Sequence, residues 1–183
     1  MDPSPRSKEN HIVPVPGAGE TESRRLTQRE RTLAAAMARV RTDNTSIAAL
    51  IAAATEQSAT FKDLIDTINA SDGIVYVEAG TCGHGVRACL VHSVTVAGLN
   101  RILRITVDTH MKDHDVMWYT GHELQHAVEV LSDRTVRSDV AMYFFYEQQG
   151  TMFARRFETA ATIDAGDAVR DEVRHSRARA EAR

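Results

Sequence analysis

The segment His122-Glu123-Leu124-Gln125-His126 constrains this chain more than any other, because it places two histidines four residues apart. On an α-helix, residues i and i+4 lie one above the other, so both imidazoles can bind one metal ion. The glutamate directly after the first histidine then points to the space in front of that metal, where it can act as a general base on water. The motif therefore predicts a helix that carries a metal site and a group for acid–base chemistry.

The residues around the motif are typical of such a helix. Between Val116 and Leu131 there is no proline, and the one glycine, Gly121, comes directly before the motif. Apolar residues recur along one side of the helix, and the two histidines lie nearly opposite. The apolar residues are Met117, Leu124, Val128 and Leu131. We therefore expect an amphipathic helix with ligands on its second side; the alternative is a pair of surface histidines on an ordinary helix.

A third metal ligand has to come from elsewhere, because catalytic zinc usually takes three protein ligands and leaves the fourth position to water. No histidine occurs between His126 and His175, so an acidic ligand is expected. Glu158 is the preferred candidate and Glu147 the second, because small residues after Glu158 would let a final helix approach the motif helix closely. Those small residues are Ala161, Ala165 and Gly166. Glu129 suits orientation of an imidazole better than ligation. For each acid the alternative is an ordinary solvated or ion-paired glutamate.

Length and charge limit the remaining classes. A chain of 183 residues with a net charge of −3 fits one domain without a general attraction to nucleic acid or to anionic membranes. All four prolines fall in residues 1–16, which predicts a disordered leader over residues 1–25 and a single domain over residues 26–183. The longest aliphatic run, Ile47–Ala54, is too short to span a bilayer. No signal peptide is visible, which indicates a cytoplasmic protein, or an exported one if the N-terminus is truncated or misassigned.

Helical and strand-like stretches together predict an α+β fold. Helices are expected over residues 26–41, 47–54, 61–69, 116–131, 138–149 and 156–176, and strands over residues 74–77, 86–96 and 101–107. Because the connections between the strands look short, we expect a small, mainly antiparallel sheet. N-terminal helices would precede this sheet, and the motif helix and the C-terminal helices would follow it.

The two cysteines allow three interpretations. Cys82 and Cys89 flank a glycine-rich loop, where they could form a disulfide if the protein is exported, or remain free thiols in a reducing cytoplasm. A second metal site that also uses His84 and His92 is the least favoured interpretation. Cys89 and His92 would face opposite sides of a strand, since side chains alternate along it.

On these residues the chain resembles the zincin metallopeptidases, and within them the gluzincin branch, in which HExxH is followed by a glutamate on a later helix. It is most similar to small, mostly uncharacterised bacterial proteins that carry GHELQHAxEV and a later FETAA-like segment, here residues 121–130 and 157–161. The resemblance covers residues 74–173. It implies a minimal zincin domain with an edge strand above the site, to which an extended substrate pairs, and residues 101–107 fit that strand.

Motif and resemblance together predict zinc-dependent hydrolysis of a peptide or protein substrate. Zinc held by His122, His126 and Glu158 would activate a water molecule, and Glu123 would carry the proton to the leaving amine. Candidate donors for the developing oxyanion are Tyr143, Tyr146, Arg155 and His114. Trp118 and Tyr119 are expected in the core or in the wall of a cleft. The alternative function is a zincin-like protein without turnover, with a structural zinc site or a cleft that binds a partner.

Overall fold

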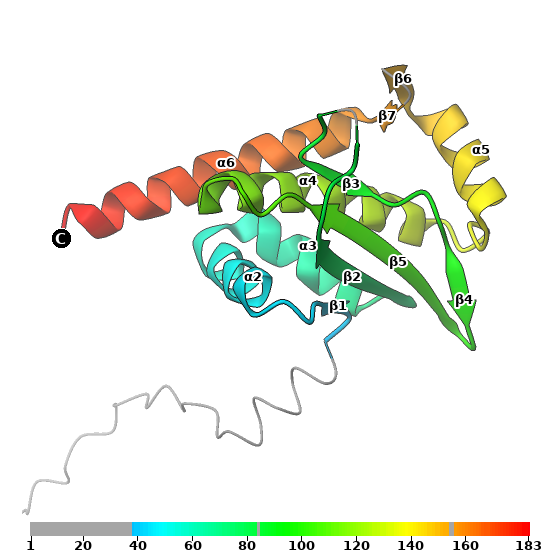
Figure 1. The fold of residues 1–183 in the computed structure, drawn as a ribbon, viewed down its shortest axis with the longest axis horizontal. Helices are drawn as coiled ribbons and strands as arrows, with labels where there is room; N and C mark the ends of the chain where they lie inside the picture. The colour runs from blue at the N-terminus through cyan, green and yellow to red at the C-terminus, as the bar shows by residue number, and fades with distance from the viewer. Residues whose placement is uncertain (1–37, 84, 154–155) are drawn as a thin grey trace, which may run out of the picture. The chain divides into compact units, whose positions relative to one another are not determined.

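The described part of this computed structural model, residues 38–83, 85–153 and 156–183, contains a small sheet, a separate two-stranded hairpin and five helices (Figure 1). The predicted α+β fold is confirmed. The predicted leader and residues 26–37 of the first predicted helix lie outside the described residues. The predicted end of that helix is wrong, because Val40–Arg41 form strand β1, and Arg39 O accepts a hydrogen bond from Val75 N at 2.8 Å. Pairing with the sheet takes this segment away from the helical conformation.

Helices α2 (Thr45–Gln57) and α3 (Ala59–Asn69) begin where polar residues can cap them. The side chain of Asn44 accepts hydrogen bonds from two backbone N–H groups of α2, and Ser58 accepts one from α3. These bonds satisfy N–H groups that a helix leaves without partners at its start. Glu172 then accepts a hydrogen bond of 2.6 Å from the Ser58 hydroxyl, which ties the last helix to this junction.

The main sheet has the strand order β1-β2-β5-β3, and β4 also pairs with β5. Strands β2 (Gly73–Ala79) and β5 (Asn100–Val107) are parallel, whereas β3 (Ala88–Leu90) and β4 (Thr95–Ala97) are antiparallel to β5. The prediction of a mainly antiparallel sheet is therefore wrong. The chain leaves β2, forms β3 and β4 on the far side of β5, and only then enters β5, so β2 and β5 meet through a crossover and run parallel.

Two further expectations about strands also fail. The stretch 86–96 is not one strand, because β3 ends at Leu90 and β4 begins at Thr95. Strand β5 is not an edge strand, since it lies between β2 on one side and β3 and β4 on the other. Within the described residues, the outer edge of β3 pairs with no other strand. The edge strand beside the motif helix is therefore β3.

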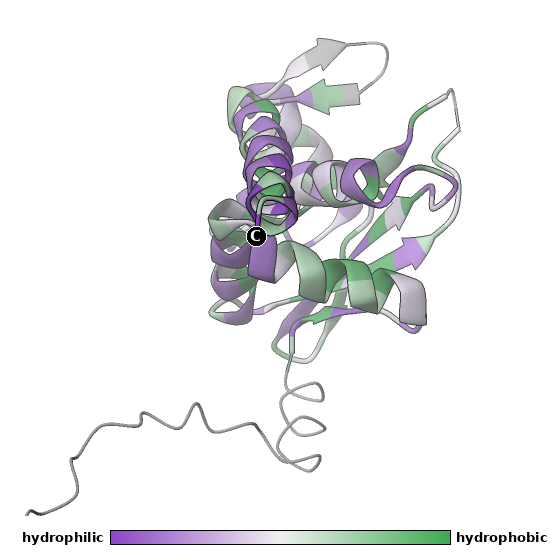
Figure 2. Cartoon of the chain, turned by 90° about the vertical axis from the view of Figure 1, so that its left-hand side faces the viewer, coloured by the Kyte–Doolittle hydropathy of each residue, from purple (hydrophilic) through white to green (hydrophobic). Residues whose placement is uncertain are grey.

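One face of the sheet packs against helices. Alternate residues of β2 and β5 are buried, as expected for strands covered on one face. Helix α4 (Asp113–Ser132) contacts β3 and β5, and helix α6 (Ala160–Glu181) packs on α4 (Figure 1). Figure 2 shows hydrophobic colour along the strands and mostly hydrophilic colour along α6. None of the described helices combines the length and apolarity that a membrane span requires.

Helix α4 is buried on more sides than its sequence predicts. The predicted apolar residues Met117, Leu124 and Leu131 are buried, as expected. Val128 of the predicted stripe is only half-buried, whereas seven residues of the helix outside the stripe are buried: Val116, Thr120, Gly121, Glu123, His126, Ala127 and Val130. The helix contacts the sheet, α3 and α6. Its two histidines therefore lie at the margin of a core rather than on an open surface.

A buried arginine caps the C-terminal end of α4. Arg101 of β5 is fully buried, and its guanidinium donates hydrogen bonds to four backbone carbonyls and to the carboxylate of Asp72. The carbonyls belong to Val130, Leu131, Asp133 and Val136, at distances of 3.0, 2.8, 2.6 and 3.1 Å. These bonds satisfy carbonyl groups that a helix leaves unpaired at its end. They fix the motif helix to the central strand.

The last part of the chain carries a short hairpin before the final helix. Helix α5 (Asp139–Gln149) is followed by β6 (Thr151–Phe153), β7 (Arg156–Glu158) and α6. The prediction that Glu158 lies within the final helix is wrong, because Glu158 ends β7 and Thr159 is the N-cap of α6. The position of Glu158 is therefore set by the pairing of β7 with β6 and by the start of α6.

Candidate metal centre

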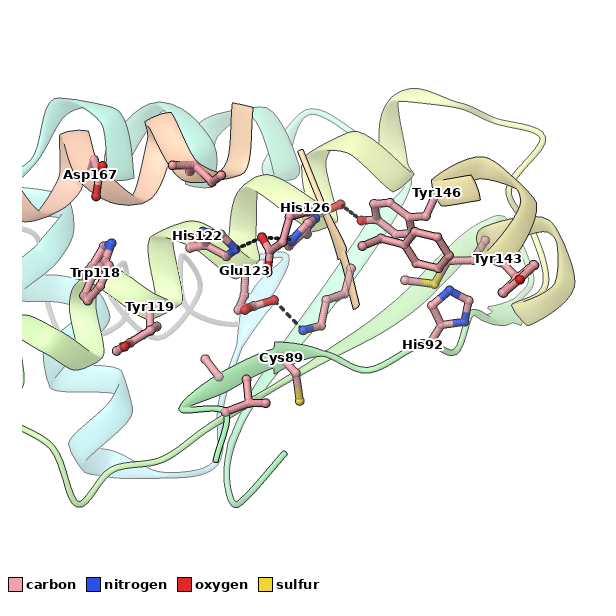
Figure 3. Close-up of a pocket in the computed structure, with 17 residues that line it drawn as sticks. Cys89, His92, Trp118, Tyr119, His122, Glu123, His126, Tyr143, Tyr146 and Asp167 are labelled. Carbon is pink, nitrogen blue, oxygen red and sulfur yellow. Dashed lines mark hydrogen bonds and ion pairs between the residues drawn. The ribbon is translucent and has the colours of Figure 1, made fainter. Parts of the chain in front are cut away.

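Three predicted ligands come together at one point. His122 and His126 lie one turn apart on α4, and Glu158 reaches them from the end of β7 (Figure 3). Glu158 Oε2 lies 3.0 Å from His122 Nε2 and 3.7 Å from His126 Nε2. One ligand atom from each residue lies within 4.8 Å of the other two. Glu147, the second candidate, is exposed on α5 and does not belong to this cluster.

The cluster has the chemistry that a divalent metal requires. Glu158 Oε2 is buried and, among the described residues, accepts no hydrogen bond of ordinary geometry. The two imidazole Nε2 atoms lie 3.0 and 3.7 Å from this oxygen without a well-formed hydrogen bond, and a cation between the three groups would satisfy it. The imidazoles of His122 and His126 hold the pKa of Glu158 at about 2, so it is an anion at neutral pH. Two imidazole nitrogens and one carboxylate suit zinc and also other first-row divalent metals.

Glu129 orients one of the histidines, as its position in the sequence predicts. Its Oε2 lies 3.3 Å from His126 Nδ1, and its Oε1 accepts a hydrogen bond of 2.5 Å from the Thr159 hydroxyl. Burial alone would lower the pKa of His126, but the Glu129 and Glu158 carboxylates outweigh burial and raise it to about 9. A proton on Nδ1 directed at Glu129 leaves Nε2 to face Glu158, which is the arrangement that metal-binding histidines use.

Glu123 is a buried carboxyl beside the cluster. Its Oε2 accepts a hydrogen bond of 2.6 Å from Leu90 N of the edge strand β3. Burial raises the pKa of Glu123 above its ordinary value, and the charges of His126 and His122 offset only part of this effect. The carboxyl therefore lies between the ligand helix and the edge strand, with its position fixed by a backbone N–H group.

Two glycines let α4 and α6 approach closely at the site. A Cβ atom on Gly166 would lie 2.9 Å from Trp118 Nε1 and 3.2 Å from His122 Cβ, and a Cβ atom on Gly121 would lie 2.9 Å from Val169 Cγ2. The predicted contribution of small residues in the final helix holds for Gly166 and Ala165, which are buried. It fails for Ala161, which is exposed, because the helix turns that residue towards solvent.

The cluster opens into a cavity of about 620 Å³. Trp118, Tyr119 and Asp167 lie at one end of it, and His92 and Tyr143 at the other, with the histidine ligands between (Figure 3). Trp118 and Tyr119 therefore belong to the wall of a cleft, one of the two places the sequence predicts for them. The lining also includes Val86, Ala88, Cys89, Leu90, Met142, Tyr146, Phe157 and Ile163.

The four predicted oxyanion donors differ in their positions. Tyr146 uses its hydroxyl to donate a hydrogen bond of 3.0 Å to His126 O, and burial raises the pKa of Tyr146 above its ordinary value. Tyr143 lines the cavity and is partly exposed. His114 pairs with Asp115 at 3.4 Å, away from the cavity lining, and Arg155 lies outside the described residues. Tyr143 and Tyr146 thus both line the cleft, but the hydroxyl of Tyr146 is already used in its bond to His126 O.

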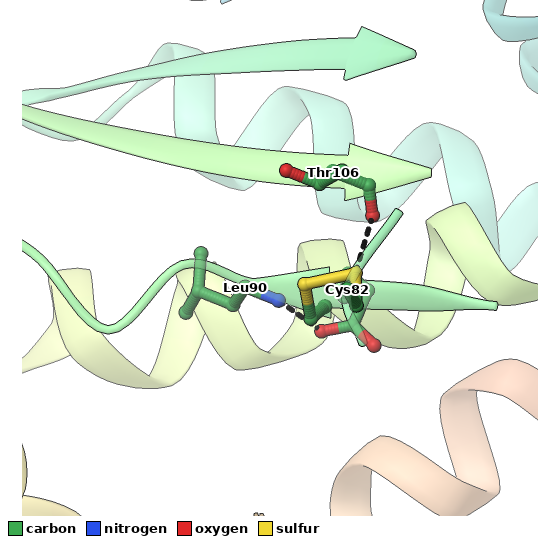
Figure 4. The surroundings of a disulfide bond; sticks show 5 residues. Cys82, Leu90 and Thr106 are labelled. Atoms are coloured by element: carbon green, nitrogen blue, oxygen red, sulfur yellow. Dashed lines mark hydrogen bonds between the residues drawn. A yellow bond between two sulfur atoms is a disulfide. The ribbon is translucent and has the colours of Figure 1, made fainter. Parts of the chain in front are cut away.

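A disulfide joins Cys82 to Cys89 beside the site (Figure 4). It bonds both thiols covalently, so the least favoured interpretation, a second metal site on these cysteines, is wrong. His84, the third residue of that set, lies outside the described residues. His92, the fourth, lines the cleft instead. The disulfide fastens the segment after β2 to the edge strand, one residue before the N–H group that holds Glu123.

Comparison of the chain with protein-family models, with curated proteins and with solved structures gives no match. The chemistry available to the site is set by its donor atoms, its buried carboxyl group and its cleft. These features define a candidate metal centre with a buried carboxyl group beside it.

Proposed function

We propose that this protein is a zinc-dependent peptidase in which His122, His126 and Glu158 hold the metal and Glu123 moves protons. One observation carries the proposal. The three ligand atoms lie within 4.8 Å of one another, and the cluster that they form opens into a cavity of about 620 Å³. Structural zinc sites are closed by four protein ligands, whereas catalytic sites leave one position open. A buried carboxyl at the same opening favours catalysis over a purely structural role.

Glu123 would transfer the protons of the reaction. When bound, zinc would act as a Lewis acid: it would polarise a carbonyl group and lower the pKa of a water molecule, so that the water loses a proton more readily and becomes a better nucleophile. The Glu123 carboxylate can accept the proton of that water and return it to the amine nitrogen as the carbon–nitrogen bond breaks. The hydrogen bond from Leu90 N keeps one carboxylate oxygen in place, so the other is free to face the reacting water.

The free edge of β3 offers a place for the peptide. Arg87 O accepts a hydrogen bond from Asp108 N at 2.7 Å, and Val91 N donates one to Arg104 O at 2.8 Å, so the odd-numbered residues face β5. The backbone groups of Ala88 and Leu90 consequently point to the opposite edge, where Leu90 N meets Glu123. An extended peptide added to this edge would pass the metal ligands. Strand β3 thus takes the role that the sequence suggests for residues 101–107.

Metal content tests the ligand set. We expect one zinc ion per chain in the wild-type protein, strongly reduced occupancy in His126→Ala and Glu158→Ala, and full occupancy in Glu147→Ala, as measured by elemental analysis after dialysis. Glu147→Ala is the matched control, because it removes an exposed glutamate from the neighbouring helix. A wild-type protein that holds no zinc after reconstitution would end the proposal.

Turnover tests the role of Glu123. Zinc-loaded wild-type protein should cleave members of a mixed peptide library, and Glu123→Gln should keep its zinc and lose activity by about 100-fold or more. Zinc binding without cleavage of any peptide would favour the alternative function, a zincin-like protein that binds a partner without turnover. Full activity in Glu123→Gln would contradict the general-base role.

A further inference from the structure

Four aromatic rings gather at one end of the cleft. Tyr143 and Phe157 have ring centroids 5.7 Å apart, and Tyr146 stacks on Phe157 at 5.8 Å. The imidazole of His92 lies 6.2 Å from Tyr143 and 6.3 Å from both Tyr146 and Phe157. All four side chains line the cavity. We call this group the aromatic subsite.

The aromatic subsite begins directly at the candidate metal centre. The ring of Tyr146 packs edge-on against the ligand His126, with centroids 5.4 Å apart. Phe157 immediately precedes the ligand Glu158 on β7. A chemical group held at the metal therefore lies next to these rings.

The subsite suits an apolar occupant. Tyr146, a member of the subsite, and Met142, which also lines the cavity, are buried, whereas Tyr143 retains 41% of its surface exposed. Burial lowers the pKa of His92, which keeps this imidazole neutral at pH 7. The other end of the cleft is different, because Asp167 lines it and the guanidinium of Arg170 lies 4.7 Å from the centre of the Trp118 ring. Apart from the metal cluster and Glu123, the acidic side chain that lines the cavity, Asp167, therefore lies at the end away from the aromatic subsite.

We propose that the aromatic subsite binds a large apolar side chain, above all an aromatic one, of the substrate residue next to the cleaved bond. This assignment rests on the proposed peptidase function. An aromatic side chain buries a large area, and edge-to-face contacts with other rings add to the gain. The half-exposed ring of Tyr143 and the imidazole of His92 would close over such a side chain, while Tyr146 and Phe157 form its floor.

Two hydroxamates that differ in one substituent test the assignment without turnover. Acetohydroxamate and 3-phenylpropanohydroxamate bind metals through the same group, and only the second carries a phenyl ring. We expect the phenyl compound to bind zinc-loaded Glu123→Gln full-length chain at least about tenfold more tightly, as measured by calorimetry. The double variant His92→Ala, Tyr143→Ala should lose most of this preference. Val140→Ala is the control, since Val140 lies on the same helix, 66% exposed and outside the cavity lining.

The outcomes separate this assignment from the proposed function. Equal affinity for the two hydroxamates, with zinc bound, overturns the aromatic subsite and leaves the metal centre intact. An undiminished phenyl preference in the double variant also overturns the assignment, because the phenyl ring would then bind elsewhere. No zinc and no binding of either compound overturns the proposed peptidase, and the assignment with it.

Discussion

The hydroxyl of Thr159 lies 2.5 Å from Glu129 Oε1, and this hydrogen bond joins the two parts of the chain that carry the candidate metal ligands. Glu129 contacts His126 through its other oxygen, at 3.3 Å. Thr159 directly follows Glu158, and its side chain also accepts a hydrogen bond of 3.2 Å from Thr162 N at the start of α6. The position of Glu158 relative to the histidines therefore depends on a chain of side-chain hydrogen bonds as well as on the backbone.

Replacing Thr159 by valine should weaken zinc binding. The variant keeps the shape of the side chain but loses the hydroxyl that fixes Glu129, and such outer contacts typically change metal affinity by about 10- to 100-fold. Competition with a chromophoric chelator measures the affinity. Thr159→Ser retains the hydroxyl and should bind zinc like the wild type. Unchanged affinity in Thr159→Val would show that the hydrogen bond does not position the ligands.

Gly166→Ala should force α6 away from α4. The added methyl group would lie 3.2 Å from His122 Cβ and 2.9 Å from Trp118 Nε1, which is closer than packed atoms allow. We expect a loss of about 1–3 kcal/mol in the free energy of unfolding, measured with urea, and weaker zinc binding. Helix propensity alone predicts the opposite sign, a gain of up to about 1 kcal/mol. A more stable variant would therefore contradict the close packing.

Arg101→Met should destabilise the protein severely. The substitution leaves four backbone carbonyls at the end of α4 without their side-chain donor, and because each unsatisfied buried acceptor costs about 1–3 kcal/mol, we expect a total loss of about 3–5 kcal/mol. Arg104→Met is the matched control on the same strand, because Arg104 is exposed and its closest acid, Glu78, is 3.8 Å away. Urea denaturation should show a change within about 0.5 kcal/mol for the control. Similar effects in both variants would contradict the capping role of Arg101.

The pair of Asp72 and Arg101 should make stability depend on acid pH. The Arg101 guanidinium donates hydrogen bonds to Asp72 and holds the pKa of that carboxyl below its ordinary value of about 4. The stabilisation is therefore fully present above about pH 5 and is lost as the pH falls through the lowered pKa of the folded state. In Asp72→Asn, the unfolding free energy should fall less between pH 6 and pH 3. An identical pH dependence in both proteins would refute this linkage.

Removal of the disulfide should reduce stability and loosen the edge strand. Cys82 and Cys89 are separated by seven positions, and closing so short a loop is worth about 2–3 kcal/mol in the chain-entropy model. We expect Cys82→Ser, Cys89→Ser to lose this amount and to exchange the amide proton of Leu90 faster. Wild-type protein treated with a reductant should match the double variant. If the Leu90 amide proton exchanged slowly in both the double variant and the reduced wild-type protein, the hydrogen bond to Glu123 alone would hold the strand.

The sequence predicts the local part of the site and little of its long-range part. The spacing of His122 and His126 follows from helix geometry alone, so the structure places both on one helix as expected. Glu158 is the preferred acid in the sequence and does join the cluster, but from a strand end rather than from a helix. The hairpin that holds it depends on the pairing of β6 with β7, which leaves only a weak signal in so short a segment.

The order of the strands and the role of Arg101 are harder to predict. An arginine within an alternating strand normally indicates a solvent-facing position, whereas the acceptors of Arg101 come from Asp72, the end of α4 and the segment after it, which only the folded chain brings together. The crossover from β2 to β5 is equally hard to predict, because the segment between these strands contains turn residues that fit a simple meander as well. Tertiary packing decides both features.

The shortness of β3 has a consequence for self-association. An unpaired strand edge invites pairing with a second copy of the same chain, and proteins limit this hazard by keeping such edges short or interrupted. Strand β3 spans only three residues, and one of its outward N–H groups is already taken by Glu123. Such an edge can hold a brief stretch of extended chain, yet it gives too few ladder bonds to extend the sheet into another molecule. Glu123, the side chain that would move protons, therefore also limits pairing of this strand with a second copy of the chain.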